Sequence, residues 1–184
     1  RLILEDMEVE IFKLGLLGSK ENIATIAEII SDYPDIPLII DPILASGRGD
    51  AFSDIDARTM MMELLFPESL LITPNSLEAR QLVSDEQEPS NLAIDACADR
   101  FKKMGCENIL ITGTHDNTEN VINTLYNSSN QIIPYHWDRL PGSYHGSGCT
   151  LTAAISAYYA LGLSIDEAVE EAQHFTWKTL KNSF

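Results

Sequence analysis

The segment from His145 to Leu151, H-G-S-G-C-T-L, carries the clearest chemical signal in this sequence. Its two glycines permit a tight turn, and a helix rich in small residues is expected to follow. The backbone N–H groups of Gly146, Ser147 and Gly148 would then point into one space at a helix N-terminus, which favours an anion. Cys149 falls in the first helical turn, where the pKa of a thiol tends to be lowered, so it could act as a base or nucleophile. Alternatively, the glycines only cap a closely packed helix, and Cys149 is a small core residue.

Acidic residues also come shortly after two apolar runs that are typical of buried strands. Asp41 ends the run 38–40 and is followed by a proline, so helix capping explains it poorly. Asn75 and Glu78 have the spacing of a capping box, which is one interpretation of this pair. The other is that these oxygens, directly or through water, hold Mg²⁺.

Several common site motifs do not fit. The glycine segment lacks the lysine of a phosphate-binding P-loop, the third glycine of a dinucleotide fingerprint and the glycine that follows a nucleophile elbow. His145 and Cys149 alone do not make a zinc site. A thiol hydrolase is disfavoured because no third residue is evident that would orient His145.

Short apolar runs alternate with amphipathic stretches of helical length, a pattern that predicts an α/β fold with a mostly parallel sheet. The expected strands are Val9–Leu14, Pro37–Asp41, Ser69–Thr73, Asn108–Thr112 and an antiparallel edge hairpin of Val121–Tyr126 and Gln131–His136. The expected helices are Ser19–Tyr33, Asp54–Phe66, Asn75–Val83, Ser90–Met104, Gly146–Leu161 and Ser164–Lys181. Ligands bind beyond the carboxyl ends of strands in such sheets. Asp41, Asn75 and the pair Thr112-Gly113 are therefore expected at one edge.

Composition narrows the class of protein. The 184 residues are 45% hydrophobic and 22% charged, as expected of one globular domain. The formal net charge of −16 disfavours nucleic acid and membrane partners, and it means that an anionic substrate needs a locally built site. The three cysteines form no disulfide pattern, which favours a reducing cytoplasm. No apolar run reaches the roughly 18 residues of a membrane helix.

Four segments carry a resemblance to a known family. They are K-L-G-L-L-G (13–18), L-I-I-D-P-I-L-A-S-G (38–47), L-I-T-P-N-S-L-E-A (71–79) and H-G-S-G-C-T-L-T-A-A (145–154). Together they resemble the hydroxymethylpyrimidine/phosphomethylpyrimidine kinases of thiamine biosynthesis, within the ribokinase-like superfamily. The resemblance implies one three-layer αβα domain over 1–184, with helices on both faces of the sheet. It also implies phosphorylation of 4-amino-5-hydroxymethyl-2-methylpyrimidine and its monophosphate with ATP and Mg²⁺.

The resemblance also implies roles for the residues of the glycine segment and the strand ends. Cys149 would deprotonate the acceptor oxygen, and the N–H groups of 146–148 would stabilise the transferring phosphoryl group. Asn75 and Glu78 would organise Mg²⁺, with Asp41 near the metal and phosphates. Cysteine at position 149 is typical of the pyrimidine kinases, where most sugar kinases of the superfamily carry aspartate.

Other positions match the family's ligand contacts. Leu16 and Ile43 correspond to residues that line the pyrimidine pocket, although both could equally be core residues. Thr112 and Gly113 match positions at the ATP phosphates, where family members usually have a lysine in place of Thr112.

Departures from the family pattern leave alternatives open. The family's glycine-rich opening segment is not in the sequence, so we expect an N-terminally incomplete kinase domain. With Thr112 in place of a lysine, we also expect weak nucleotide binding and little or no activity from the chain as given. A pyridoxal kinase-like enzyme, a non-catalytic kinase-like fragment and a homodimer all stay open.

Overall fold

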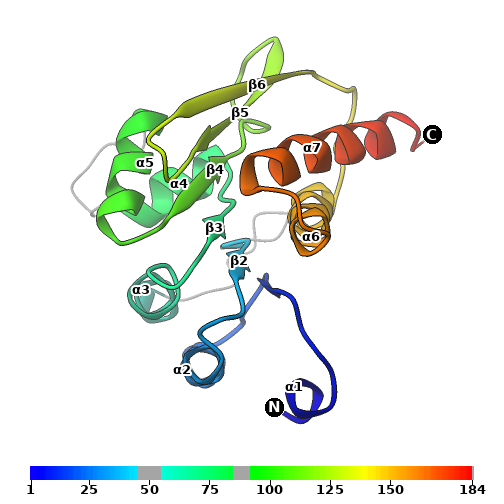
Figure 1. Ribbon diagram of the computed structural model, residues 1–184. Helices are drawn as coiled ribbons and strands as arrows, with labels where there is room; N and C mark the ends of the chain where they lie inside the picture. The colour runs from blue at the N-terminus through cyan, green and yellow to red at the C-terminus, as the bar shows by residue number, and fades with distance from the viewer. Residues whose placement is uncertain (45–54, 85–91, 184) are drawn as a thin grey trace.

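The computed structural model describes residues 1–44, 55–84 and 92–183, and they form a sheet covered by helices (Figure 1). The strands are β1 (Phe12–Leu14), β2 (Leu38–Ile40), β3 (Leu71–Ile72), β4 (Asn108–Ile111), β5 (Asn120–Tyr126) and β6 (Ile132–Asp138). The helices are α1 (Leu2–Asp6), α2 (Lys20–Asp32), α3 (Ile55–Leu64), α4 (Ser76–Val83), α5 (Ile94–Lys103), α6 (Ser147–Ala160) and α7 (Ile165–Lys181).

The six strands lie in sequence order, β1 to β6, in one sheet. Strands β1 to β4 are parallel, whereas β5 is antiparallel to both β4 and β6. Strand β6 therefore runs in the same direction as β4. As a result, the carboxyl ends of β1 to β4 and of β6 share one edge of the sheet with the β4–β5 connection.

Two apolar cores lie on opposite faces of the sheet, because successive strand residues point to opposite sides. In β2, Ile40 belongs to the core under α2 to α5, whereas its neighbour Ile39 belongs to the core under α6 and α7. The same alternation is seen in β4 between Ile109 and Leu110. Figure 1 shows α6 and α7 on the side of the sheet away from α2 and α3. The predicted three-layer αβα architecture, with its mostly parallel sheet and antiparallel edge hairpin, is confirmed.

The predicted elements differ from the structure mainly at their ends. The strand expected over Val9–Leu14 is shorter, and it pairs only from Phe12 onward. Helix α1 was not predicted, since it buries no side chain and so shows no amphipathic pattern. The first residues of the helices expected over Asp54–Phe66 and Ser90–Met104 lie outside the described residues. Among the described helices, none is long and apolar enough to cross a membrane.

Candidate active site

The predicted strand-end residues meet at the carboxyl edge of the sheet. Asp41 follows β2, and its backbone N–H donates to the carbonyl of Leu14 at the end of β1 (2.9 Å). Next to it, the segment after β3 pairs with the segment after β4. There the N–H of Thr112 donates to Pro74 (3.0 Å), and the N–H of Ser76 donates back to Thr112 (2.9 Å). The backbone therefore fixes these segments beside one another.

The N-terminus of α6 lies at the same edge. Gly146 is the N-cap in a left-handed conformation (φ 84°), which glycine adopts without strain. The first helical bond runs from the N–H of Thr150 to the carbonyl of Gly146 (2.9 Å), so the amides of residues 147–149 precede it and have no partner within the helix. A buried contact of 2.9 Å between the hydroxyls of Thr73 and Thr152 joins α6 to the end of β3. The turn at Gly146, which the sequence predicts to bind an anion, thus lies directly beside the strand ends.

Cys149 is exposed and lies beside the buried carboxylate of Asp41. The thiol and the carboxylate are close enough for each to influence the pKa of the other. The expectation that the helix N-terminus lowers the pKa of the Cys149 thiol is wrong. Partial burial and the negative charge of Asp41 raise it instead, and Lys13 offsets this in part. The thiol is therefore mostly protonated at neutral pH, while its thiolate form is a stronger base.

Asp41 carries a buried charge that Lys13 compensates only in part. Only 5% of the residue is exposed, and its Oδ2 has no hydrogen-bond partner. Burial raises the pKa of this carboxyl, although Lys13 and the neighbouring Cys149 thiol counteract the shift. The Lys13 Nζ atom lies 4.0 Å from Oδ2. A buried, unpartnered oxygen at a strand end is available to a ligand.

Sequence reasoning did not single out Lys13 as a functional residue. It comes from β1, and it is a cation facing Asp41 at the carboxyl edge. A signal was present, because Lys13 is a charged residue in a short strand of a parallel sheet, where apolar residues are the rule. In a chain of net charge −16, it supplies positive charge beside the α6 N-terminus.

Asn75 and Glu78 form the capping box that their spacing predicts. The Asn75 side chain accepts from the N–H of Glu78 (2.9 Å), and the Glu78 carboxylate accepts from the N–H of Asn75 (2.9 Å). Glu78 therefore lies in the first turn of α4 rather than at a strand end. Burial, together with the negative charge of Asp41, raises the pKa of Glu78 to about 7, while its backbone hydrogen bonds partly offset the shift. The two carboxylates thus lie close enough to repel each other.

The raised pKa of Glu78 has a consequence for stability. From its ordinary value of 4.5 up to about 7, the folded state favours the protonated form, so the carboxyl destabilises the fold increasingly as the pH rises through this window. Glu78→Gln removes the charge and keeps an oxygen that can accept from Asn75. We expect the free energy of unfolding of the variant, relative to wild type, to increase by on the order of 2 kcal/mol as the pH rises from about 5 to about 8. Urea denaturation at several pH values measures this difference.

Glu167→Gln is the matched control for that experiment. Glu167 occupies the same capping-box position in α7, but it is fully exposed and its pKa is lowered by hydrogen bonds from Ser164. Its substitution should therefore give no stabilisation at pH 8. A Glu78→Gln difference that does not change with pH would contradict the proposed charge burial.

Thr112 and Gly113 lie at the end of β4, and the backbone of Gly113 is closely packed. A Cβ at Gly113 would lie 2.2 Å from the carbonyl oxygen of Ile122, so no side chain fits there. Its N–H donates to the buried Asn123 side chain (3.1 Å). These contacts hold the start of the β4–β5 connection in place at the carboxyl edge.

Leu16 and Ile43 line one small cavity of about 20 Å³ between the β1 and β2 ends and the helices α2 and α3. Leu16 is 48% exposed, and it therefore does not belong to the core as the alternative interpretation held. Ile43 is half-buried in the same cavity wall. The structure thus brings the two predicted substrate contacts together.

The family follows from comparison of this chain with known proteins. The model of the phosphomethylpyrimidine kinase family matches residues 1–184. The chain belongs to this family. It is 29% identical to the hydroxymethylpyrimidine/phosphomethylpyrimidine kinase of Bacillus subtilis, where the match covers 98% of this chain and 67% of that protein. It is also 29% identical to the thiamine biosynthesis bifunctional protein ThiED of Geobacter sulfurreducens, covering 94% of this chain and 35% of that protein.

Solved structures of related kinases share the fold. The phosphomethylpyrimidine kinase of Clostridium difficile matches with a TM-score of 0.81 at 26% identity, covering 97% of this chain and 72% of that one. The pyridoxal kinase of Staphylococcus aureus in complex with pyridoxal matches with a TM-score of 0.82 at 26% identity, covering 94% and 62%. The chain thus spans about one third to somewhat more than two thirds of the length of these four relatives.

Proposed function

We propose that the protein phosphorylates 4-amino-5-hydroxymethyl-2-methylpyrimidine, and then its monophosphate, with ATP. The observation that carries this proposal is the position of Cys149, which lies at the N-terminus of α6 beside the buried carboxylate of Asp41. Glu78 lies close to the same carboxylate. A base, an anion-binding turn and acidic groups are thus combined at one edge of the sheet, in a chain that belongs to the phosphomethylpyrimidine kinase family.

The reaction requires positioning and charge stabilisation more than covalent chemistry. The hydroxymethyl oxygen of the pyrimidine forms a bond to the γ-phosphorus of ATP, and the bond from that phosphorus to the bridging oxygen breaks, which releases ADP. The hydroxyl proton passes to the thiolate of Cys149. The amides of Gly146, Ser147 and Gly148 bind the transferring phosphoryl group, because they precede the first hydrogen bond of α6 and have no partner within the helix.

The acidic residues fit a magnesium ion that is shared with ATP. In the described part of the chain, no three His, Cys, Asp or Glu side chains form a complete metal site. Mg²⁺ in kinases is commonly held by one or two carboxylates together with phosphate oxygens and water. Asp41, with its unpartnered buried oxygen, and Glu78 fit that need. The ion would neutralise charge on the phosphates.

A pyridoxal kinase is the second candidate. It is supported by the solved pyridoxal kinases, which match this fold as well as the phosphomethylpyrimidine kinase does. To separate the two, the full-length protein is given ATP and Mg²⁺ with the hydroxymethylpyrimidine, its monophosphate or pyridoxal, and phosphorylated products are identified by mass spectrometry. We expect kcat/KM for the pyrimidine to exceed that for pyridoxal at least about tenfold. A preference for pyridoxal would instead favour a pyridoxal kinase. If no acceptor gave a product, a non-catalytic kinase-like protein would be favoured.

Thr112 should limit the affinity for nucleotide. Its hydroxyl offers no full positive charge to the phosphates, so Thr112→Lys is expected to lower the Kd for ATP about tenfold, or about 1.4 kcal/mol. Isothermal titration calorimetry with ATP and Mg²⁺ measures this change. Thr112→Val, which removes only the hydroxyl, is the control and should leave Kd within about twofold of wild type. An unchanged Kd in the lysine variant would place Thr112 away from the phosphates.

The remaining inferences are part of the same proposal. We infer that residues 1–184 form one kinase domain that works in the cytoplasm without nucleic acid or membrane partners. The three cysteines are all free, which is consistent with a reducing compartment. A homodimer stays a prediction, and sedimentation measurements would test it.

A further inference from the structure

Arg139 binds the connection between β4 and β5 through three hydrogen bonds. Its Nη1 donates to the carbonyl of Thr114 (2.8 Å), its Nη2 to that of Asp116 (2.8 Å) and its Nε to that of Thr118 (3.0 Å). These carbonyls belong to alternate residues of one loop, which starts at Thr112 and Gly113. A single guanidinium thus fixes the course of the whole loop.

The opposite side of this loop is fixed by α4. The Asp116 carboxylate accepts from the hydroxyl of Ser76 (2.9 Å), which is buried at the start of that helix. Arg80, one turn later, donates to the same oxygen (3.4 Å). Ser76 directly follows the N-cap Asn75, so the loop is joined to the segment that carries the capping box.

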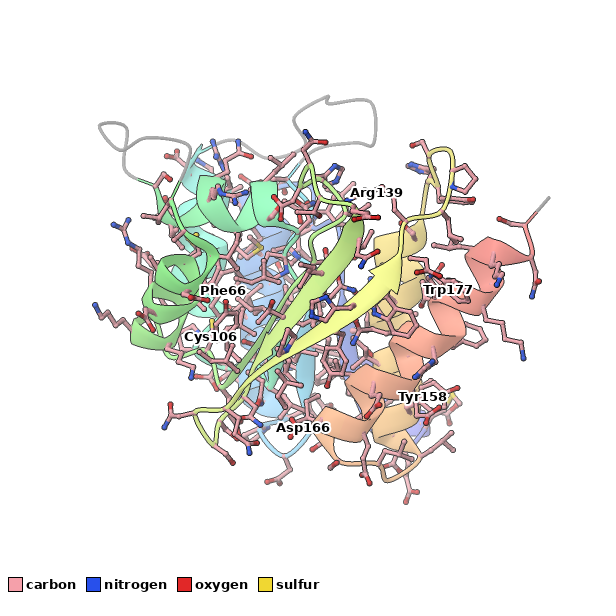
Figure 2. The ribbon with its side chains drawn as sticks, turned by 90° about the horizontal axis from the view of Figure 1, so that it is seen from above. Phe66, Cys106, Arg139, Tyr158, Asp166 and Trp177 are labelled. Carbon is pink, nitrogen blue, oxygen red and sulfur yellow. The ribbon has the colours of Figure 1, made fainter. Side chains whose placement is uncertain are left out.

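Arg139 also begins the segment that leads to the anion-binding turn. It directly follows β6, and Figure 2 shows it at the end of that strand, at the edge where the strand ends meet. The residue before it is fixed to α7, because Trp177 Nε1 donates to the carbonyl of Asp138 (3.1 Å). The segment then reaches α6, where the hydroxyl of Ser147 donates to Tyr144 (3.1 Å).

We propose that Arg139 is a positioning residue that holds the β4–β5 loop in register with the segment entering the α6 N-terminus. The inference rests on the proposed function, in which this loop lies on the nucleotide side of the site and α6 carries Cys149. Arg139 connects the two sides across the sheet edge without touching either reacting group. Phosphoryl transfer depends on aligning donor and acceptor, so the loss of this connection acts on catalysis through geometry.

Only an arginine can make this connection. Its planar guanidinium reaches three carbonyls at fixed angles, whereas a lysine ammonium is one point charge at the end of a flexible chain. Arg139→Lys therefore retains the charge but loses the geometry, and Arg139→Met loses both. If the role were only to add positive charge near ATP, the lysine variant would behave like wild type.

The test has two readouts on the full-length protein. The first is amide hydrogen exchange, since the loop contains protected amides, among them Asp116 N–H to Gly113 (3.1 Å) and Thr118 N–H to Asp116 (3.0 Å). The second is steady-state kinetics with the pyrimidine and ATP. In Arg139→Met we expect faster exchange in residues 114–118. We also expect a fall of about 100-fold in kcat/KM for ATP, with KM for the pyrimidine unchanged.

Arg100→Met is the matched control. Arg100 also donates to a carbonyl, that of Val83 (2.6 Å), but it does so at the far end of α4 from Asn75. This variant should not change exchange in 114–118 or KM for ATP. Arg139→Lys should lie nearer to Arg139→Met than to wild type in both readouts.

The outcomes separate this inference from the proposed function. Unchanged exchange in 114–118 in Arg139→Met would overturn the positioning role, as would full activity in Arg139→Lys. A fall in kcat accompanied by faster exchange throughout the chain would also overturn it, because general destabilisation gives that pattern. A further outcome is faster exchange in Arg139→Met together with a wild-type protein that does not phosphorylate the pyrimidine. That combination would support the positioning role of Arg139 and overturn the proposed function.

Discussion

In the full-length protein, Cys149→Ala is expected to lower kcat for pyrimidine phosphorylation by roughly 10²–10⁴ while barely changing KM for ATP. The alanine cannot take the hydroxyl proton, but the backbone amides that bind the phosphoryl group stay in place. The substitution should also cost little stability, because Cys149 is exposed. Steady-state kinetics at saturating ATP, together with thermal unfolding of both proteins, measures the effect.

The pH dependence of kcat provides a check that a structural role would not reproduce. Partial burial and the charge of Asp41 raise the pKa of the thiol, so the thiolate becomes more populated as the pH rises, and wild-type kcat should increase across the neutral range. Cys149→Ala should lose that increase. Cys97→Ala is the control, because Cys97 is buried in α5, in the core on the opposite face of the sheet from α6. Unchanged kcat in Cys149→Ala would remove the base from the proposed reaction.

Much of the fold could be predicted from the sequence, because strands with fully apolar runs belong in parallel sheets that are buried on both faces. The runs 38–40 and 70–72 show this directly, and the buried strands β2 and β3 form within them. Helices with a strong apolar face were equally predictable. Helix α1 was not, since none of its residues is buried and its formation depends on local backbone bonds only.

The features of the candidate site that depend on residues close together in the sequence were predictable. The capping box at Asn75 and the turn at Gly146 follow from short spacings, and the structure shows both. The environment of Cys149 was not predictable, because its pKa depends on Asp41, which is 108 positions away in the chain. Arg139 was missed for the same reason, since nothing near it in the sequence shows that a loop 21 to 25 residues earlier supplies its partners.

Asp41→Asn is expected to reduce activity and to increase stability at the same time. The pKa of the Asp41 carboxyl is raised by burial, so the fold favours its protonated form. Above the ordinary pKa of 3.8, the ionised carboxyl therefore destabilises the protein, and the loss grows as the pH rises through the raised value. The neutral amide of asparagine has nearly the same shape and removes that cost. Lys13, at 4.0 Å, loses its partner, but its attraction is the smaller contribution to the shift.

The activity should fall because the same charge has two uses in the proposed reaction. It raises the pKa of Cys149, which makes the thiolate a stronger base, and its unpartnered oxygen is available to Mg²⁺. We expect kcat to fall by roughly 10²–10³, which is the effect of losing one electrostatic contact in an active site. The concentration of Mg²⁺ that gives half-maximal activity should rise as well.

A matched substitution separates this effect from a general change of charge. Asp56→Asn also removes a carboxylate that is paired with a lysine, since its Oδ2 lies 3.9 Å from the Nζ of Lys20, but its side chain is 78% exposed. We expect this control to leave kcat and thermal stability close to wild type, because exposed ion pairs contribute little. A higher melting temperature together with lower kcat in Asp41→Asn alone indicates that the fold retains a destabilising charge for its chemistry. If Asp41→Asn lost stability and activity in parallel, Asp41 would instead be a structural residue that holds the ends of β1 and β2 together.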